Sequence, residues 1–337
     1  MITQSEHFNI RAFNTFGINA QCDCWIEFTE ASDLPVVFAS MTSDRYRCIG
    51  QGSNMLFVND YHGTLLHSRI LDFDIEHRDA DMLIRIGSGM PFDDVVSKCC
   101  EIGYWGIENL SGIPGDAGAA AVQNIGAYGV EIKDVLVKVE AYDTVANKFV
   151  DFSNDACQYA YRHSVFKDHE NAGRYVVTHI TIKVTKNGGP LLNYGNLKAG
   201  LERNGNITPM DVRKLVIETR NAKLPDPTKV GSAGSFFKNP VVELADYNRI
   251  STIVGTSVPH YPMGDKVKIP AAWLIEQCGW KGRTIGNAGV WHLQPLVLVN
   301  ATGRATGEEI LALEGEIVRD VKEKFGIILH PEADHIY

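Results

Sequence analysis

The chain has 337 residues, of which 45% are hydrophobic and 22% charged, and its 32 basic against 41 acidic side chains give a formal net charge of −9. This length predicts about two domains. The composition is typical of a soluble globular protein and excludes the disordered, collagenous and fibrous classes. No basic stripe suited to a phosphate backbone is visible, so we expect no nucleic-acid partner.

The first residues favour a cytoplasmic protein. Residues 1–13 carry Glu6, His7, Asn9 and Arg11 where a signal peptide needs an uninterrupted apolar core. No later stretch approaches the ~18 apolar residues of a membrane span, so we expect no membrane partner. The seven cysteines lack the spacing of a zinc site or a disulfide framework, which predicts free thiols and no bound metal.

In the first half of the chain, glycine-bearing stretches separate short apolar runs. Residues 50–54 (Gly-Gln-Gly-Ser-Asn) lie between two such runs and predict a strand, a tight loop and a second strand. Residues 82–86 alternate as a strand does, and residues 92–100 have helical spacing after Pro91. Residues 109–129 hold five glycines and five alanines in 21 residues, a stretch whose backbone amides could approach a ligand closely.

The second half contains a clear strand and two clear helices. Residues 175–184 alternate, and Thr208 with Pro209 predicts the start of a helix. Thr306 and Glu309 form a capping-box pattern for a helix whose apolar stripe ends at Gly326. Strands outnumber helices in the first half without regular alternation, so we predict an α+β fold rather than a doubly wound sheet.

Several familiar nucleotide-binding and hydrolytic motifs are missing. Gly50 and Gly52 are followed by Met55 where a Rossmann fingerprint needs a third glycine, and there is no Walker loop or His-Glu-x-x-His sequence. Residues 50–54 and 109–129 could instead pair as a nest of backbone N–H groups for a pyrophosphate. The alternative, that they are only turns, stays open here.

Three polar residues are ambiguous when taken singly. Ser235 follows Gly234 and precedes two phenylalanines, but no glycine follows it, so it is not a hydrolase nucleophile elbow. It could donate a proton to a carbanion or enolate, or be an ordinary loop hydroxyl. Arg162 and Glu332 would by themselves be read as solvated surface charges.

Eight strings, in this order along the chain, resemble the UDP-N-acetylenolpyruvoylglucosamine reductase family, also called UDP-N-acetylmuramate dehydrogenases. The resemblance covers nearly the whole chain, and Asn193-Tyr-Gly-Asn196 is similar to the loop that marks the family's first type. The strings are Asn14-Thr-Phe-Gly17, Gly50-Gln-Gly-Ser-Asn54, Gly112-Ile-Pro-Gly115, Gln123-Asn-Ile-Gly-Ala-Tyr-Gly129, Tyr161-Arg162 with Phe166-Lys167, Lys223-Leu-Pro-Asp-Pro227, Ala233-Gly-Ser-Phe-Phe-Lys-Asn-Pro240 and His330-Pro-Glu332.

The resemblance implies a fold, a cofactor and a reaction. The fold would be α+β, with a p-cresol methylhydroxylase/vanillyl-alcohol oxidase-like FAD-binding part of two subdomains (1–68 and 69–206). A C-terminal α+β substrate domain (207–326) and a tail returning to the active site (327–337) would follow. A monomer with non-covalent FAD, using NADPH, would reduce the small-molecule substrate UDP-N-acetylglucosamine enolpyruvate to UDP-N-acetylmuramate, a step of peptidoglycan synthesis and hence of cell-wall growth, shape and division.

The same resemblance implies roles for individual residues. FAD would be held by Gly50, Gly52, Ser53, Asn54, Ser111, Gly112, Ile113, Pro114, Gly115, Asn124, Gly126, Ala127, Tyr128, Gly129 and Arg220. The UDP part would contact Tyr194, Lys223, Asn239, Lys268 and Gln294. The catalytic residues would be Ser235, Arg162 and Glu332.

Each implied catalytic role makes physical sense. Hydride from flavin N5 to the methylene carbon builds negative charge on the adjacent carbon and its carboxylate, and that charge needs stabilisation. Arg162 would hold the carboxylate, and Ser235 would deliver the proton. Glu332 would stabilise the enolic form only if protonated. Asp116 departs from the resemblance, because a carboxylate near a pyrophosphate weakens binding unless it points away.

Two rival interpretations remain at this stage. One is an oxygen-using alcohol oxidase on the same FAD fold; it is disfavoured because no His or Cys lies in a recognisable flavin-attachment context and Ser235 would have no role. The other is a catalytically inactive nucleotide-binding module, against which the intact Ser235, Arg162 and Glu332 argue.

Overall fold

The computed structural model describes residues 1–193, 197–200, 206–255 and 257–337, and its contacts divide the chain into two compact units. Unit 1 comprises residues 1–8, 22–51 and 62–220, and unit 2 comprises residues 9–21, 52–61 and 221–337. Each unit is built from three separate stretches of chain. The four-part division given above (1–68, 69–206, 207–326 and 327–337) stays a prediction.

Unit 1 contains two sheets and a short hairpin. A four-stranded sheet has the order β1-β2-β5-β3, with β3 and β5 parallel. A five-stranded antiparallel sheet has the order β11-β10-β12-β7-β6. The strands are β1 (Ile2–Asn9), β2 (Gln21–Phe28), β3 (Tyr46–Ile49), β5 (Tyr61–Ser68), β6 (Phe73–Arg78), β7 (Asp81–Gly87), β10 (Leu136–Asp143), β11 (Lys148–Ser153), β12 (Tyr175–Thr185) and the hairpin β8 (Gly126–Ala127) with β9 (Val130–Glu131).

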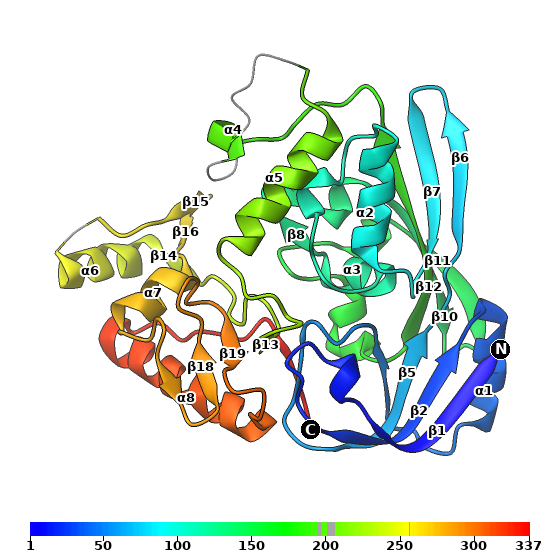
Figure 1. The fold of residues 1–337 in the computed structure, drawn as a ribbon, viewed down its shortest axis with the longest axis horizontal. Helices are drawn as coiled ribbons and strands as arrows, with labels where there is room; N and C mark the ends of the chain where they lie inside the picture. Colours follow the sequence, from blue (N-terminus) through cyan, green and yellow to red (C-terminus); the bar gives the residue numbers. More distant parts are fainter. Residues whose placement is uncertain (194–196, 201–205, 256) are drawn as a thin grey trace. The chain divides into compact units, whose positions relative to one another are not determined.

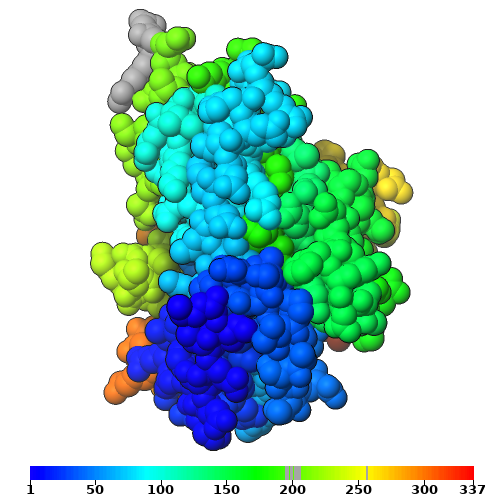
Figure 2. Space-filling view, turned by 90° about the vertical axis from the view of Figure 1, so that its right-hand side faces the viewer, coloured from blue at the N-terminus to red at the C-terminus, as the bar shows by residue number. Residues whose placement is uncertain are grey.

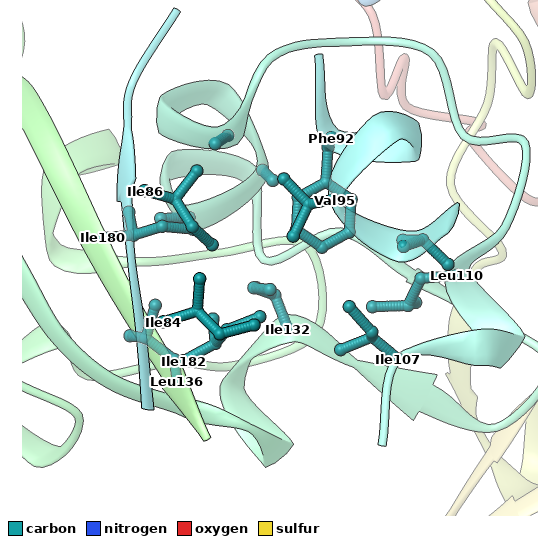
Figure 3. Packing of buried hydrophobic residues seen from close by; sticks show 14 of the residues in the cluster. Ile84, Ile86, Phe92, Val95, Ile107, Leu110, Ile132, Leu136, Ile180 and Ile182 are labelled. Atoms are coloured by element: carbon teal, nitrogen blue, oxygen red, sulfur yellow. The ribbon is translucent and has the colours of Figure 1, made fainter. Parts of the chain in front are cut away.

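Helices cover one face of the five-stranded sheet. Helix α2 (Phe92–Glu101) and helix α3 (Ala117–Gln123) lie on the same side of it (Figure 1). In Figure 3, Ile84 and Ile86 of β7 lie with Ile180 of β12 opposite Phe92 and Val95 of α2. All five are at most 1% exposed, and burying such side chains stabilises the fold by about 1.5 to 3 kcal/mol each. Both predicted strands are confirmed, and residues 82–86 alternate as expected. In β12 the alternation holds only from Ile180 to Val184, because residues 176–180 are all buried and a register shift interrupts the period.

Part of the glycine- and alanine-rich stretch is helical rather than a loop. Ala117–Gln123 forms α3, because a run of alanines has the highest intrinsic helix propensity. Gly118 lets this helix approach the chain at Ser88, since a Cβ there would lie 2.7 Å from the Cβ of Ser88. The helix ends at Asn124, which has the left-handed φ of 45° and is fully buried.

The remaining described helices of unit 1 each bury apolar side chains. Helix α1 (Leu34–Ser40) buries Leu34 and Val37 against the four-stranded sheet, and α5 (Pro209–Asn221) packs with Trp105 and the short α4 (Leu197–Gly200). Figure 2 views unit 1 from the side of the N-terminal strands, drawn in blue, where β1 is almost wholly exposed.

The described residues of unit 2 form smaller sheets and the α-helices α6, α7 and α8. One sheet has the order β13-β19-β18-β17 and another the order β14-β16-β15. These elements are β13 (Gly231–Ser232), β14 (Val241–Glu243), α6 (Leu244–Val254), β15 (Tyr261–Met263), β16 (Lys266–Lys268), α7 (Ala271–Gln277), β17 (Thr284–Ile285), β18 (Ala288–Val290), β19 (Leu298–Asn300) and α8 (Gly307–Phe325) (Figure 1). The predicted capping box is confirmed, since Thr306 and Glu309 bond reciprocally, and α8 ends at Gly326.

A third, two-stranded sheet of unit 2 joins distant parts of the chain. Strand β20 (Asp334–Ile336) pairs in parallel with β4 (Met55–Phe57). Gly307 has no room for a Cβ, because it lies directly against the carbonyl of Phe57, which brings the start of α8 onto β4. Within the described ranges, no helix combines the length and the apolar character needed to cross a bilayer.

Candidate functional site

In unit 1, the loop after β3 is clamped to the loop before α3. The side-chain amide of Gln51 donates from Nε2 to Asp116 Oδ1 at 2.8 Å and accepts at Oε1 from the N–H of Gly115 at 3.2 Å. Gly50 lies against the same carboxylate, since a Cβ there would be 2.8 Å from Asp116 Oδ2. The two loops for which a paired arrangement was predicted therefore do meet.

Asp116, the residue that departs from the resemblance, is turned into the protein. It is 4% exposed, and burial raises the pKa of its carboxyl above the usual value, opposed by the Gln51 hydrogen bond and by the charges of His67 and Arg69. Its Oδ1 is already occupied by Gln51. The carboxylate thus acts as a buried hydrogen-bond acceptor between the loops.

A second clamp holds the same loop at Gly112. The N–H of Gly112 donates to Asp93 Oδ1 at 2.6 Å, and Arg213 forms two bonds to the Asp93 carboxylate at 2.5 and 2.9 Å. Burial raises the pKa of Asp93, but the hydrogen bonds from Arg213 and Gly112 outweigh it and leave the pKa below its usual value. Gly112 has a φ of 70°, which glycine adopts without strain.

Arg220 lies half-buried beside this loop. An ideal Cβ on Gly112 would be 3.3 Å from Arg220 Nε, and burial lowers the pKa of the guanidinium, opposed by Tyr128 and Asp93. A desolvated guanidinium favours an anionic partner. This is the chemistry that a diphosphate needs next to a glycine loop.

The 124–129 segment is joined to the turn that carries Arg162. Asn124 Nδ2 donates to the carbonyl of Ala160 at 2.8 Å, and Arg162 donates to the carbonyl of Gly126 at 3.0 Å. Lys167 reinforces the junction by donating to Gln123 Oε1 at 2.6 Å. Asn109 contacts the same segment, donating to the carbonyl of Tyr128 at 2.9 Å.

Arg162 has an unusual backbone. Residues 160–163 form a tight turn closed by two bonds between Ala160 and His163, and Arg162 adopts a φ of 55° within it. Left-handed φ values in non-glycine residues cost free energy and cluster at functional sites. Its guanidinium carbon lies 5.3 Å from the centre of the Tyr161 ring.

In unit 2, residues 52–54 are fixed by their main chain. Gly52 has a φ of 59° and leaves no space for a Cβ, because it lies against the carbonyl of Phe13. Its own carbonyl accepts from Thr15. The carbonyl of Asn54 accepts from the N–H of Asp334 at 2.9 Å, and Asn54 Nδ2 donates to the carbonyl of Glu332 at 3.1 Å.

The segments carrying Ser235 and Glu332 are also paired in unit 2. The N–H of Glu332 donates to the carbonyl of Phe236 at 2.7 Å, and the N–H of Lys238 donates to the carbonyl of His330 at 2.9 Å. Ser235 is exposed; it follows Gly234, which has a left-handed conformation (φ 66°), and precedes the buried Phe236. Backbone pairing therefore brings together three strings separated by about 100 to 280 residues.

The residues expected to contact the UDP part are in varied surroundings. Lys223 is exposed, and its carbonyl accepts from Trp291 Nε1 at 3.0 Å. Asn239 Oδ1 accepts from the N–H of Ala271 at the start of α7, which leaves its amide N–H groups for other partners. Lys268 lies in β16, and its Nζ is 5.9 Å from the centre of the Tyr261 ring.

Gln294 lies in the loop before β19, where its carbonyl accepts from Val297 at 3.0 Å. The same loop reaches the Ser235 segment, since Phe236 donates to the carbonyl of Leu296 at 2.8 Å. Tyr194 lies outside the described residues.

Each unit, taken by itself, carries loops whose chemistry fits part of an FAD site. In unit 1, glycine lets the loops pack closely, Gly50 against Asp116 and Gly112 against Arg220, whose half-buried guanidinium supplies a positive charge. In unit 2, Gly52 packs in the same way against the carbonyl of Phe13. The N–H groups of Gly112 and Gly115, however, are donated to Asp93 and Gln51. These two N–H groups are therefore engaged within unit 1 rather than presented to a phosphate.

Four supporting side chains were not predicted from the sequence: Gln51, Asp93, Arg213 and Trp291. Gln51 lies within a recognised string and could have been noticed as a polar side chain between two glycines. Asp93 and Arg213 belong to helices α2 and α5, where charged residues ordinarily signal a solvated face. No pattern in the sequence relates these two positions, which are 120 residues apart.

Family models and curated relatives match most of the chain. Residues 29–147 match the FAD binding domain family, and residues 226–336 match the C-terminal domain of UDP-N-acetylenolpyruvoylglucosamine reductase. The chain is 46% identical over 329 residues to the Porphyromonas gingivalis (strain ATCC BAA-308 / W83) UDP-N-acetylenolpyruvoylglucosamine reductase, covering 96% of each chain. It is 41% identical over 334 residues to that of Bacteroides fragilis (strain YCH46), covering 98% of this chain and 99% of the relative.

A solved structure shows the same fold. The crystal structure of UDP-N-acetylenolpyruvylglucosamine reductase from Thermus caldophilus superposes with a TM-score of 0.68 at 20% identity, covering 100% of this chain and 99% of that one. The predicted α+β FAD-binding fold is thereby confirmed. At the identities and coverage found, the chain belongs to the UDP-N-acetylenolpyruvoylglucosamine reductase family.

Proposed function

We propose that this protein is an FAD-dependent oxidoreductase that reduces the enolpyruvyl group of UDP-N-acetylglucosamine enolpyruvate, giving UDP-N-acetylmuramate for peptidoglycan synthesis. Membership of the family supports the reaction. The observation that carries the assignment is the pairing of the Ser235 segment with the Glu332 segment and with Asn54 in unit 2. If Ser235, Glu332 and Asn54 were only turn or surface residues, there would be no need for their three segments, which are far apart in the sequence, to pair with one another.

FAD, when bound, supplies two-electron chemistry between a nicotinamide and the enol ether. We propose NADPH as the reductant, so that the sum is enol ether plus NADPH plus a proton giving lactyl ether and NADP⁺. Gly50, Gly52, Ser53, Asn54, Ser111, Gly112, Ile113, Pro114, Gly115, Asn124, Gly126, Ala127, Tyr128, Gly129 and Arg220 would hold FAD non-covalently.

The three catalytic residues would handle charge and the proton. The Arg162 guanidinium would bind the substrate carboxylate through its two-pronged face, stabilising charge that develops there. Ser235, which is exposed on a glycine turn, would transfer its hydroxyl proton to the carbon bearing that carboxylate. Glu332, in its protonated form, would donate a hydrogen bond to the enolic oxygen.

The rest of the substrate would be recognised by its UDP part. We propose Lys223 as the counter-ion of the diphosphate, with Tyr194, Asn239, Lys268 and Gln294 as further contacts. We also propose a cytoplasmic monomer, with no nucleic-acid or membrane partner, acting in cell-wall synthesis and thereby in cell shape and division.

Flavin absorbance followed without oxygen tests the proposal. The holoprotein is expected to lose its visible absorbance when NADPH is added, and to regain it when UDP-N-acetylglucosamine enolpyruvate follows. Mass spectrometry should then detect a product two hydrogens heavier. If the absorbance returns only when oxygen is admitted, the protein is an oxidase, and the proposed substrate and residue roles are wrong.

A further inference from the structure

A buried ion pair lies next to the paired strings of unit 2. His335 of β20 places Nε2 at 2.9 Å from Oε2 of Glu314 on α8, and the two side chains are 18% and 9% exposed. Within the described ranges neither atom has a hydrogen-bond partner, so the contact between them is an ion pair. Separating the pair would therefore leave two polar groups buried without partners.

The same histidine touches the Ser235 segment. Its ring centre lies 6.0 Å from that of Phe236, the residue that follows Ser235 and accepts the N–H of Glu332. His335 is three residues beyond Glu332, and Asp334 between them donates its N–H to Asn54. A shift of β20 would therefore move the main chain of Glu332 relative to Ser235.

The charges around His335 favour its protonated form. Glu314 raises the pKa of the imidazole above its usual value, more than burial lowers it, and Asp334 adds to the rise. Of the other groups packed against it, Tyr337 presents its ring at 6.5 Å, and β4 carries only Met55, Leu56 and Phe57. No cation among these groups opposes protonation.

We propose that the His335–Glu314 pair is a positioning device for the proton-delivery step, holding β20 and the main chain of Glu332 in place only while His335 is charged. The inference rests on the proposed function, since it assigns the pair to the half of the reaction that uses Ser235 and Glu332. Flavin reduction by the nicotinamide would not need it.

The sign of the pH dependence follows from the charged partner. Because the folded-state pKa of His335 is raised, the pair is intact at low pH and is lost as pH rises through that raised value. The rate of substrate reduction should therefore be higher at low pH, where His335 is charged, and should fall as His335 loses its proton.

The test compares the two half-reactions of the holoprotein by stopped-flow absorbance from pH 5.5 to 9. The variants are His335→Gln, Glu314→Gln, the double variant, and His62→Gln as a matched control. His62 forms an exposed pair with Asp23 in unit 1, with His62 Nδ1 3.2 Å from Asp23 Oδ1. Replacing His62 therefore removes a histidine–carboxylate pair that neither half-reaction is expected to need. FAD content and melting temperature identify any variant that fails to fold. An NMR titration of the His335 ring in the wild-type holoprotein measures the pKa of His335 directly.

We expect flavin reduction to be unchanged in all variants, and flavin reoxidation by UDP-N-acetylglucosamine enolpyruvate to fall about 10-fold in His335→Gln at pH 6. The ratio of wild-type to variant rates should approach one at high pH, and the double variant should lose no more than either single variant. A ratio that does not change with pH, equal losses in both half-reactions, or a His335 pKa at its ordinary value would overturn the inference. If the wild-type protein is not reoxidised by the sugar nucleotide at all, the proposed function itself is wrong.

Discussion

The cofactor loops of unit 1 and the Ser235–Glu332 region of unit 2 are held by different kinds of bond. In unit 1, the side chains of Gln51 and Asp93 each bind the N–H of a glycine, and each is itself held by a second charged or polar side chain. In unit 2, Ser235 and Glu332 are brought together by main-chain bonds between segments.

This difference determines what single substitutions can do. A side-chain clamp is removed by one substitution, whereas a backbone ladder survives the loss of any one side chain. We therefore expect the unit 1 loops to be sensitive to changes in residues that do not touch a ligand. In the unit 2 region, only the reacting side chains and the His335–Glu314 pair should matter strongly.

The largest effect on the rate of flavin reoxidation is expected for substitutions of Arg162. Replacing it by Met removes the proposed carboxylate clamp, and flavin reoxidation by the sugar nucleotide should slow by about 100- to 1000-fold. Arg162→Lys should recover only part of this, because an ammonium lacks the two-pronged geometry. Stopped-flow rates measure both variants, and a Lys variant equal to wild type would show that charge alone suffices.

Asp93→Asn should have the next largest effect. Arg213 would keep its buried charge without a carboxylate, and the free energy of unfolding should fall by about 2 kcal/mol, since Asp93 is 35% exposed. Urea unfolding measures the loss. The double variant with Arg213→Met should lose less than Asp93→Asn; an equal or larger loss would mean that the pair does not act as a unit.

Gln51→Ala breaks the clamp between the two glycine loops. The Asp116 carboxylate would lose its hydrogen-bond donor, and FAD should bind about 10-fold more weakly, a cost of about 1.4 kcal/mol. Equilibrium titration of the apoprotein by FAD fluorescence gives the dissociation constant. Gln51→Glu should be worse than Gln51→Ala, because it places a second carboxylate against Asp116; the reverse order would contradict the clamp.

The smallest effect is expected for Asn54→Leu. Its side-chain bond to the Glu332 carbonyl is lost, but the main-chain bond from Asp334 to position 54 remains. The free energy of unfolding should fall by only about 1 kcal/mol. A loss as large as that of Asp93→Asn would break the contrast between the two regions.

The regular elements could be predicted from sequence because one periodic face of each is buried. Residues 82–86, 92–100 and 175–184 are the strand, helix and strand expected, and the cap at Thr306 is confirmed. The helix at Ala117–Gln123 was not predicted, because its glycines and alanines have no apolar period to detect.

The site was less accessible to the same reasoning. The order of the strings alone made Ser235, Arg162 and Glu332 catalytic candidates, since the sequence around each of them is ordinary. The partners Asp93 and Arg213, or His335 and Glu314, are joined only by folding, and neither composition nor spacing relates them. What remains a prediction is which of these residues touch FAD and the sugar nucleotide.

The most direct test of the account is a single turnover of Ser235→Ala, reduced by NADPH without oxygen and then mixed with UDP-N-acetylglucosamine enolpyruvate. We predict that NADPH reduces the variant as fast as wild type, while reoxidation by the substrate slows by at least about 100-fold because no hydroxyl proton is available. Reoxidation at the wild-type rate would contradict the proposed role of Ser235 and, with it, the reason for pairing its segment with Glu332.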